Sequence, residues 1–319
     1  MKTKLLSLAS LLAILNANAI EIGPTGSGVE LSGFVVLDHT NQDATGSDSA
    51  FMTSEVELNF DFTSGPVAFA LDLEAFKGSG DANSQVDTFV EEAVVTYTFN
   101  DNFSMSAGRM LSYLGFEAYD APNMYQISGA YNTQFSYLYD AYADGVSLDY
   151  GTDDFSIGVW AGLEDQTSFE YAFAYTGIEN LTAKYIYADY GGSDESKQTI
   201  WASYSLGSLL LAAEVATHEN GSVVDSANAA NFNTGDTDAY LIMANYGITD
   251  KLSMTVRYSE TEDKVTATGG AGAGVTNATI DKVTFSPTYM VTDDLALLAE
   301  YTDISDAEEF VGIELIFTF

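Results

Sequence analysis

The sequence EVELNFDF, residues 55–62, alternates strictly between polar and apolar side chains. Successive side chains of an extended strand point to opposite faces, so Val56 and Leu58 share one face while Glu55 and Glu57 share the other. The pattern predicts a strand that has one apolar and one polar face.

Runs with the same alternation recur from one end of the chain to the other. We expect about sixteen strands, an even number that is typical of single-chain bacterial barrels. They lie near 29–39, 51–62, 66–76, 88–99, 102–111, 141–150, 154–163, 168–176, 181–190, 198–206, 208–218, 238–247, 251–260, 280–290, 294–303 and 309–319.

The links between these strands alternate in length. Short links rich in Gly, Asn and Asp, which favour turns, lie at 63–65, 100–101, 151–153, 177–180, 207, 247–250 and 291–293. Longer links lie at 40–50, 77–87, 112–140, 191–197, 219–237 and 261–279. Short turns on one side and long loops on the other are typical of an outer-membrane barrel whose short turns face the periplasm. The sequence therefore predicts an all-β fold, a transmembrane antiparallel up-and-down β-barrel, with a soluble periplasmic β protein as the alternative.

The last residues, GIELIFTF (312–319), fit the closing strand of such a barrel. We place Phe317 and Phe319 in the lipid-facing row, with Phe319 at the periplasmic rim, where aromatic girdles lie. The last strand must pair with the first, because an open edge is not tolerated in hydrocarbon. A terminal Phe in such a row also resembles the assembly signal of outer-membrane barrels, so we expect Phe317 and Phe319 to be read by the barrel-assembly machinery.

The first nineteen residues predict a secretory signal peptide. Lys2 and Lys4 precede the apolar run 5–15, and residues 17–19 form a small-x-small cleavage site. We therefore divide the chain into a signal peptide, 1–19, and a single barrel domain, 20–319. After the signal peptide, no apolar run reaches the length of about 18 residues that a spanning helix needs.

The charge of the chain is strongly acidic. It carries 10 basic and 47 acidic residues, a formal net charge of −37, and no cysteine. Such a charge repels nucleic acid, so we exclude DNA and RNA as partners. An anion-specific channel needs rings of Arg or Lys that this chain does not supply. The acidity favours cations, unless it serves only as a solvated surface.

The polar face of the predicted strands is lined by small residues such as Ser104, Ser147, Thr255 and Thr284. A barrel of about sixteen strands encloses an aqueous channel. A small hydroxylated lining suits such an open pore.

The longest link, 112–140, has tyrosines at 113, 119, 125, 131, 137 and 139. Links of this length are functional or disordered, and the aromatic content argues against disorder. We expect this loop, which follows the fifth strand, to fold into the lumen and narrow the pore. An extracellular flap is the alternative.

Six charged residues form the constriction that we predict: Arg109, Glu117, Asp120, Lys184, Arg257 and Lys282. Three of the cations fall on inward positions, whereas Arg109 falls in the lipid-facing row, where a charge is costly. We expect a bulge at Gly108 to turn Arg109 inward. Facing the two loop acids, these cations would set a field across the pore. Alternatively, each cation pairs with a lumen carboxylate such as Glu57, Glu74, Glu92 or Glu300.

Two segments carry a family resemblance. GRMLSYLGFEAYDAPNMYQ (108–126) and YDAYADGVSLDY (139–150) resemble the OmpL-like β-barrel porins in a glycine–arginine strand end, an aromatic Gly-Phe-Glu stretch, a loop Asn and a strand that begins near Asp-Gly-Val. The general trimeric porins of Gram-negative bacteria are the neighbouring family. The resemblance implies a porin in the outer membrane, with solute passage as its activity.

The leading function is therefore passive diffusion of small hydrophilic solutes through an outer-membrane porin that prefers cations. We assign no catalytic residue, no cofactor and no metal ligand. A barrel enzyme would need a general base, and the chain offers His39 and His218, beside Asp38 and Glu219.

A structural or adhesin barrel is the third possibility. Acidic loops at 43–48 and 194–195 would hold divalent cations in such a protein, or bridge lipopolysaccharide. Outer-membrane lipid and lipopolysaccharide are expected partners in either case, and the analogy with porins implies a homotrimer.

Overall fold

The computed structural model describes residues 19–22, 26–42, 50–77, 87–117, 119–131, 138–163, 168–191, 194–224, 232–267, 275–305, 307 and 309–319. The predicted signal peptide, apart from its last residue, lies outside this part of the chain, as does the acidic loop 43–48. Among the described residues, no helix has the length and apolar character needed to cross a bilayer.

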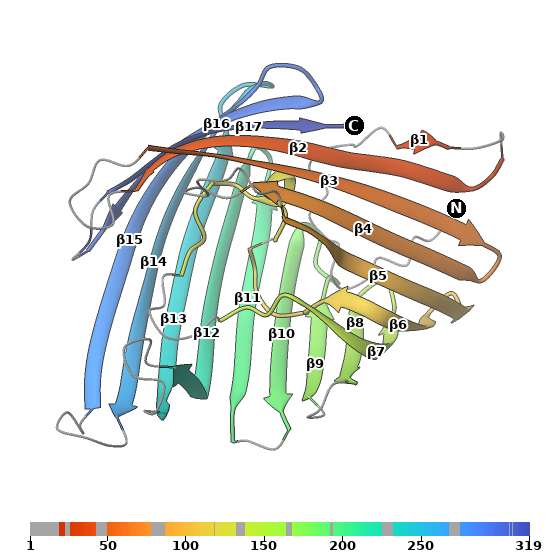
Figure 1. Cartoon of the computed structure of the whole chain (residues 1–319), viewed down its shortest axis with the longest axis horizontal. Coiled ribbons are helices and arrows are strands. Elements are labelled where there is room, and N and C mark those ends of the chain that lie inside the picture. Colours follow the sequence, from red (N-terminus) through yellow and green to blue (C-terminus); the bar gives the residue numbers. More distant parts are fainter. Residues whose placement is uncertain are drawn as a thin grey trace.

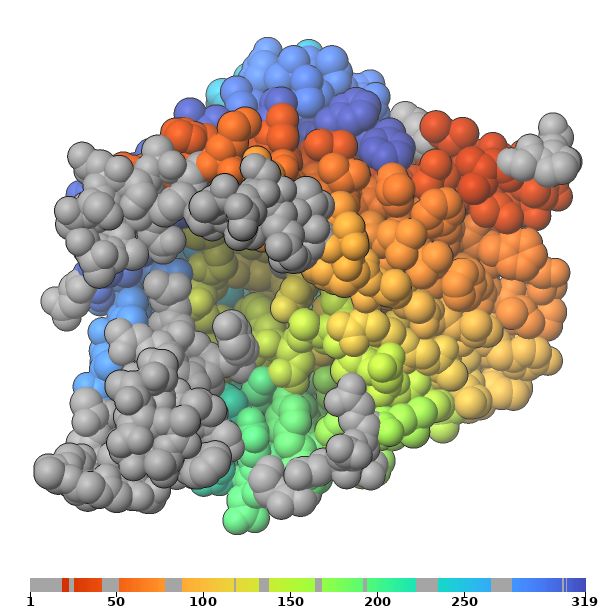
Figure 2. Space-filling view, viewed as in Figure 1, coloured from red at the N-terminus to blue at the C-terminus, as the bar shows by residue number. Residues whose placement is uncertain are grey.

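Sixteen antiparallel strands, β2 to β17, form a closed barrel, as the sequence predicts (Figure 1). Their bounds are β2 Val29–Gln42, β3 Ala50–Ser64, β4 Val67–Lys77, β5 Asp87–Asn100, β6 Phe103–Leu111, β7 Tyr142–Gly151, β8 Phe155–Gly162, β9 Ser168–Tyr175, β10 Leu181–Tyr190, β11 Ser196–Leu206, β12 Leu209–Val224, β13 Phe232–Gly247, β14 Leu252–Ala267, β15 Val275–Met290, β16 Leu295–Ile304 and β17 Phe310–Thr318. Each strand pairs with its neighbours in the chain, and β17 pairs with β2 to close the barrel. Figure 2 shows β2 to β7 side by side over the face turned to the viewer.

Both ends of the chain pair with β2 where the barrel closes. Phe319 and Gly33 exchange two backbone hydrogen bonds, each of 3.0 Å. Just beyond them, the short strand β1 (Ile20–Glu21) pairs with Leu31 and Glu30 of β2, and Figure 1 shows the C-terminus beside β1. The terminal Phe therefore continues the ladder that hydrocarbon requires to be complete.

Side chains of each strand alternate between lipid and lumen. In β17, Val311, Ile313 and Phe317 are exposed on the outer face, whereas Glu314 and Thr318 are buried on the inner one. The rings of Phe317 and Phe319 stack with their centroids 6.1 Å apart. The lipid-facing row predicted for the C-terminus is confirmed.

Strands β12 to β15 are longer than the sequence predicts. Pairing of β12 with β13 continues to Val224 and Phe232, and pairing of β14 with β15 continues to Thr266 and Val275. The expected links at 219–237 and 261–279 are therefore too long. Outside the bilayer both faces of a strand meet water, so the apolar alternation stops while backbone pairing goes on.

We call the link between β6 and β7 the constriction loop (residues 112–141), and its described residues, 112–117, 119–131 and 138–141, lie inside the barrel (Figure 1). Its Leu114 and Phe116 are buried in one cluster with Ile186, Trp201 and Leu241 of the barrel wall. The Phe116 and Trp201 rings meet edge to face at 5.4 Å. The inward course predicted for this loop is confirmed, and the alternative of an extracellular flap is wrong.

Candidate functional site

The tip of the constriction loop is bound to the inner face of three strands. Glu300 of β16 accepts hydrogen bonds from the backbone N–H groups of Ile127 (2.6 Å) and Ser128 (2.9 Å), and from the Ser128 hydroxyl. The Ser259 hydroxyl of β14 donates to the carbonyl of Ala130 at 2.6 Å. Barrel side chains thus provide hydrogen-bond partners for backbone N–H and C=O groups of the loop that are not paired within a helix or a sheet.

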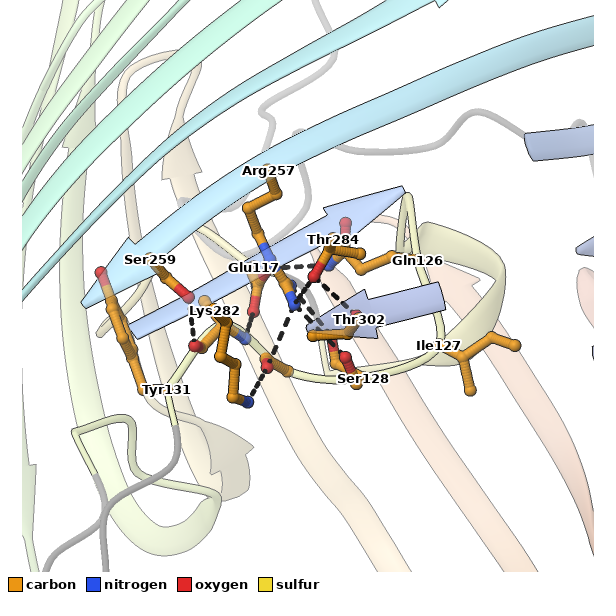
Figure 3. A network of polar contacts seen from close by, with 12 residues as sticks. Glu117, Gln126, Ile127, Ser128, Tyr131, Arg257, Ser259, Lys282, Thr284 and Thr302 are labelled. Carbon is orange, nitrogen blue, oxygen red and sulfur yellow. Dashed lines mark hydrogen bonds and ion pairs between the residues drawn. The ribbon is translucent and has the colours of Figure 1, made fainter. Parts of the chain in front are cut away.

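Arg257 of β14 is the centre of this network (Figure 3). It forms an ion pair with Glu117 of the loop, and its Nη1 also donates to the carbonyl of Ser128 at 2.9 Å. Its Nη2 donates to the carbonyl of Gly129 and to the Thr284 hydroxyl, both at 3.2 Å. The Arg257 side chain is 0% exposed and that of Glu117 6%, so the pair is shielded from water. Removing one partner of such a pair leaves an uncompensated buried charge, which is strongly destabilising.

Glu117 uses both of its carboxylate oxygens within this contact. Its Oε1 accepts a hydrogen bond from the Gln126 amide and its Oε2 one from the backbone N–H of Ala130, each at 2.6 Å. Lys282 of β15 donates to the carbonyl of Gly129 at 2.9 Å beside them. Glu117 is therefore the counter-ion of Arg257 and does not face the solute path.

The two ends of the loop are fixed to β9 and β12. Glu170 accepts from the Ser112 hydroxyl and from the backbone N–H of Tyr113, both at 2.8 Å. Glu214 accepts from the phenols of Tyr131 (3.1 Å) and Tyr139. Burial raises the pKa of both Tyr131 and Tyr139, so both phenols remain protonated donors.

Another ion pair lies near the loop's end. Lys197 of β11 binds Asp140, and the phenol of Tyr190 donates to the same carboxylate. Lys197 lies in the stretch 191–197 that we expected to be a link, so it is not among the predicted constriction residues. The inward alternation of β11 places it, once the strand is known to begin at Ser196.

On the opposite side of the lumen lies a surface that we call the acidic wall: Glu55, Glu57, Asp72, Glu74, Glu91 and Glu92. These carboxylates stand on the adjacent strands β3, β4 and β5, where Glu57 pairs across the ladder with Glu74, and Asp72 with Glu92. Within the described part of the chain, no ion pair connects any of the six to a lysine or arginine.

Asp120 of the constriction loop faces this wall. Carboxylate oxygens of Asp120, Glu57 and Glu91 all lie within 4.8 Å of one another. Burial raises the pKa of Asp120, while a hydrogen bond from the Asn123 amide at 3.4 Å opposes that effect. Three carboxylates at this spacing are a hard-oxygen set of the kind that attracts cations.

A bulge exists near Arg109, but it is not at Gly108. The register between β4 and β5 shifts at Glu91, which turns this residue toward the lumen next to Glu92. Strand β6 pairs through Gly108 and Arg109 without a shift on either side. Arg109 therefore keeps its place in the outer row, and its Nε donates to the carbonyl of Val90 at 3.1 Å.

The six predicted residues thus do not form one cluster. The structure brings together Arg257, Lys282 and Glu117, whereas Arg109 and Asp120 lie elsewhere. The ammonium group of Lys184, on β10, lies 5.2 Å from the Trp201 ring centroid. Arg257 and Glu117 meet in direct contact at the loop and do not face each other across open water. Of the carboxylates suggested as partners for these cations, Glu300 joins the network, but it binds loop N–H groups.

The two histidines do not share a site. His218 is buried on the inner face of β12 and lies 2.8 Å from Glu195, whereas His39 is exposed on the outer face of β2. His218 thus lies within hydrogen-bonding distance of an acid of the loop at 194–195.

The chain matches the family model of beta-barrel porin-2, OmpL-like, over residues 34–312. No curated protein sequence matches it. Among solved structures, OmpF of Salmonella typhi is similar with a TM-score of 0.68 at 16% identity, covering 94% of this chain and 100% of that one. OmpT of Vibrio cholerae is similar with a TM-score of 0.65 at 14% identity, covering 95% and 100%. The outer-membrane channel DcaP of Acinetobacter baumannii has a TM-score of 0.63 at 12% identity, covering 94% and 100%.

Identities this low show the fold alone. The family match covers most of the chain, including the strands that carry the acidic wall and the whole constriction loop. We conclude that this protein belongs to the OmpL-like β-barrel porin-2 family and resides in the bacterial outer membrane.

Proposed function

We propose that the protein is a passive diffusion channel for small hydrophilic solutes and that it prefers cations. Membership of a porin family supports a channel over an enzyme. A closed sixteen-stranded barrel is wide enough to hold an aqueous lumen, which the constriction loop narrows.

One observation carries the cation preference. Three cations among the described residues contact the loop: Arg257 binds Glu117, Lys197 binds Asp140 and Lys282 binds a backbone carbonyl. A fourth, Lys184, lies against the Trp201 ring of the wall. The acidic wall and Asp120, in contrast, have no basic partner among the described residues. Among the described residues the lumen therefore carries an excess of carboxylates without a basic partner, of which Glu57, Glu74 and Glu91 are buried and the others half-buried. A pore lined with one sign of charge concentrates ions of the other.

The test is planar-bilayer conductance of the folded chain, with the reversal potential measured in a KCl gradient. Stable conductance steps and a potassium-preferring reversal potential are expected. Steps that prefer chloride would overturn the selectivity, and a folded, heat-modifiable barrel without steps would overturn the channel.

The expected partners follow from the location. We propose contact with outer-membrane lipid and lipopolysaccharide, insertion by the barrel-assembly machinery, and a homotrimeric state. A trimer form is described for OmpT of Vibrio cholerae, which shares this fold. The mass of the protein in detergent, before and after heating, tests the trimer.

A further inference from the structure

We propose that Arg257 is a positioning residue, and that its contact with Glu117 acts as a latch that sets the aperture of the pore. The proposal rests on the channel function above and names the group that holds the constriction in place. It replaces the expected role of Arg257 and Glu117 as opposed charges across the solute path.

Next to the latch, an acid and a base of the wall bind successive backbone groups of the loop tip. Glu300 takes two backbone N–H groups of the loop tip, and Arg257 takes the next two carbonyls together with the Glu117 carboxylate. The planar guanidinium fork binds several acceptors at fixed angles, which a lysine does not reproduce. The wholly buried Arg257 side chain donates five hydrogen bonds, four to the loop and one to Thr284 of the wall.

Ala121 and Ile127 of the loop pack against wall residues that include Leu298 and Ile316, but this apolar contact leaves a gap on one side. A cavity of about 230 Å³ lies next to the tip, on the side of the short turns. Pro122, Met124 and Tyr125 of the loop line it, together with Leu252 and Met290 of the wall. The polar contacts of Arg257 and Glu300 therefore add fixed, directional restraints to an apolar contact that is incomplete on this side.

The latch also determines which charges the solute meets. With Glu117 in place, the charge of Arg257 is neutralised inside the contact. If the contact opens, a carboxylate or a guanidinium enters the lumen, according to which partner is removed. Loop position and ion preference are thus linked through one ion pair.

Single-channel recording of the whole chain in a planar bilayer tests the proposal, with neutral polymers of increasing size as a measure of aperture. For Arg257→Met we expect a step conductance roughly twofold larger than wild type, with more current fluctuation and entry of larger polymers, because pore diameter controls passage. Arg257→Lys keeps the charge next to Glu117 and should restore part of the wild-type polymer cut-off. Lys264→Met removes the same charge from an exposed pair with Asp238 and should leave the cut-off unchanged.

Glu300→Gln provides a second variant if Arg257→Met does not fold into a heat-modifiable barrel. It keeps the side-chain shape and weakens the bonds to Ile127 and Ser128, so the same shift in polymer cut-off is expected. Wild-type steps with an unchanged cut-off in the folded variants would overturn the latch while leaving the channel intact. Absence of steps in wild type would instead overturn the proposed function.

Discussion

Replacing Asp120 by Asn removes the loop charge that faces the acidic wall and keeps the side-chain shape. Asp120 stands within 4.8 Å of carboxylate oxygens of Glu57 and Glu91, so a cation that passes the wall passes this group as well. The Asn side chain retains the acceptor that binds the Asn123 amide. We therefore expect the loop to keep its course and the ion preference to change.

The size of the change follows from Coulomb's law. At about 5 Å in water, one unit charge attracts a cation by about 0.8 kcal/mol and repels an anion by the same amount. At 0.15 M salt the Debye length of about 8 Å reduces each value to roughly half. The difference between the two ions is then about 0.8 kcal/mol, or about fourfold in permeability ratio. In 0.01 M salt, where the Debye length is about 30 Å, the change should approach tenfold.

The assay is the potassium-to-chloride permeability ratio from reversal potentials at pH 8, in both salt concentrations. Asp101→Asn, in the exposed turn between β5 and β6, makes the same charge change outside the constriction and is the matched control. A change below twofold in dilute salt, or one equal to that of the control, would refute the reasoning that Asp120 lines the solute path.

Three further predictions concern pH, closure and backbone strain. Burial raises the pKa of Asp120, so on acidification its carboxylate becomes neutral at a higher pH than an ordinary Asp, whose pKa is about 3.9. Once Asp120 is neutral, wild type and Asp120→Asn should have the same ion preference. Reversal potentials measured over a pH series check this. Deleting Phe319 removes two hydrogen bonds to Gly33 and a stacked ring, so it should lower the free energy of unfolding by about 3 kcal/mol. Phe319→Ala removes only the ring and should lower it by about 1 kcal/mol. Urea unfolding in lipid vesicles should rank the two variants in that order. Gly108 has φ +138°, and an added Cβ would lie 2.0 Å from the carbonyl oxygen of Ala93. Gly108→Ala should therefore lower the free energy of unfolding by about 2 to 3 kcal/mol in the same assay. An unchanged urea midpoint would contradict this.

The strands were predictable because each one is decided locally. Lipid on one side and water on the other impose a period of two on the side chains, and EVELNFDF or GIELIFTF shows that period without help from any distant residue. The short turns were predictable for the same reason, since their Gly, Asn and Asp residues favour turns by themselves. Where a strand leaves the bilayer, as in β12 to β15, both faces meet water, so the local signal ends before the strand does.

The charged residues were predictable as members of a lumen, but their partners were not. The alternation placed Arg257 and Lys282 inward, and the length of the loop placed Glu117 inside the barrel. Whether acid and base would face each other across water or touch depends on how the loop packs. The bulge at Glu91 was equally invisible, because it arises from the register between β4 and β5.

The sequence by itself determined the membrane barrel, its strands and the acidic character of its lumen, because these depend on the solvent that each side chain meets. Only the tertiary structure decided that Arg257 and Glu117 close a latch and that Asp120 faces the acidic wall. Arg257 and Glu117 are 140 positions apart in the chain. Contacts over such a separation are set by where the closed barrel places the loop, and no local pattern of residues encodes that placement.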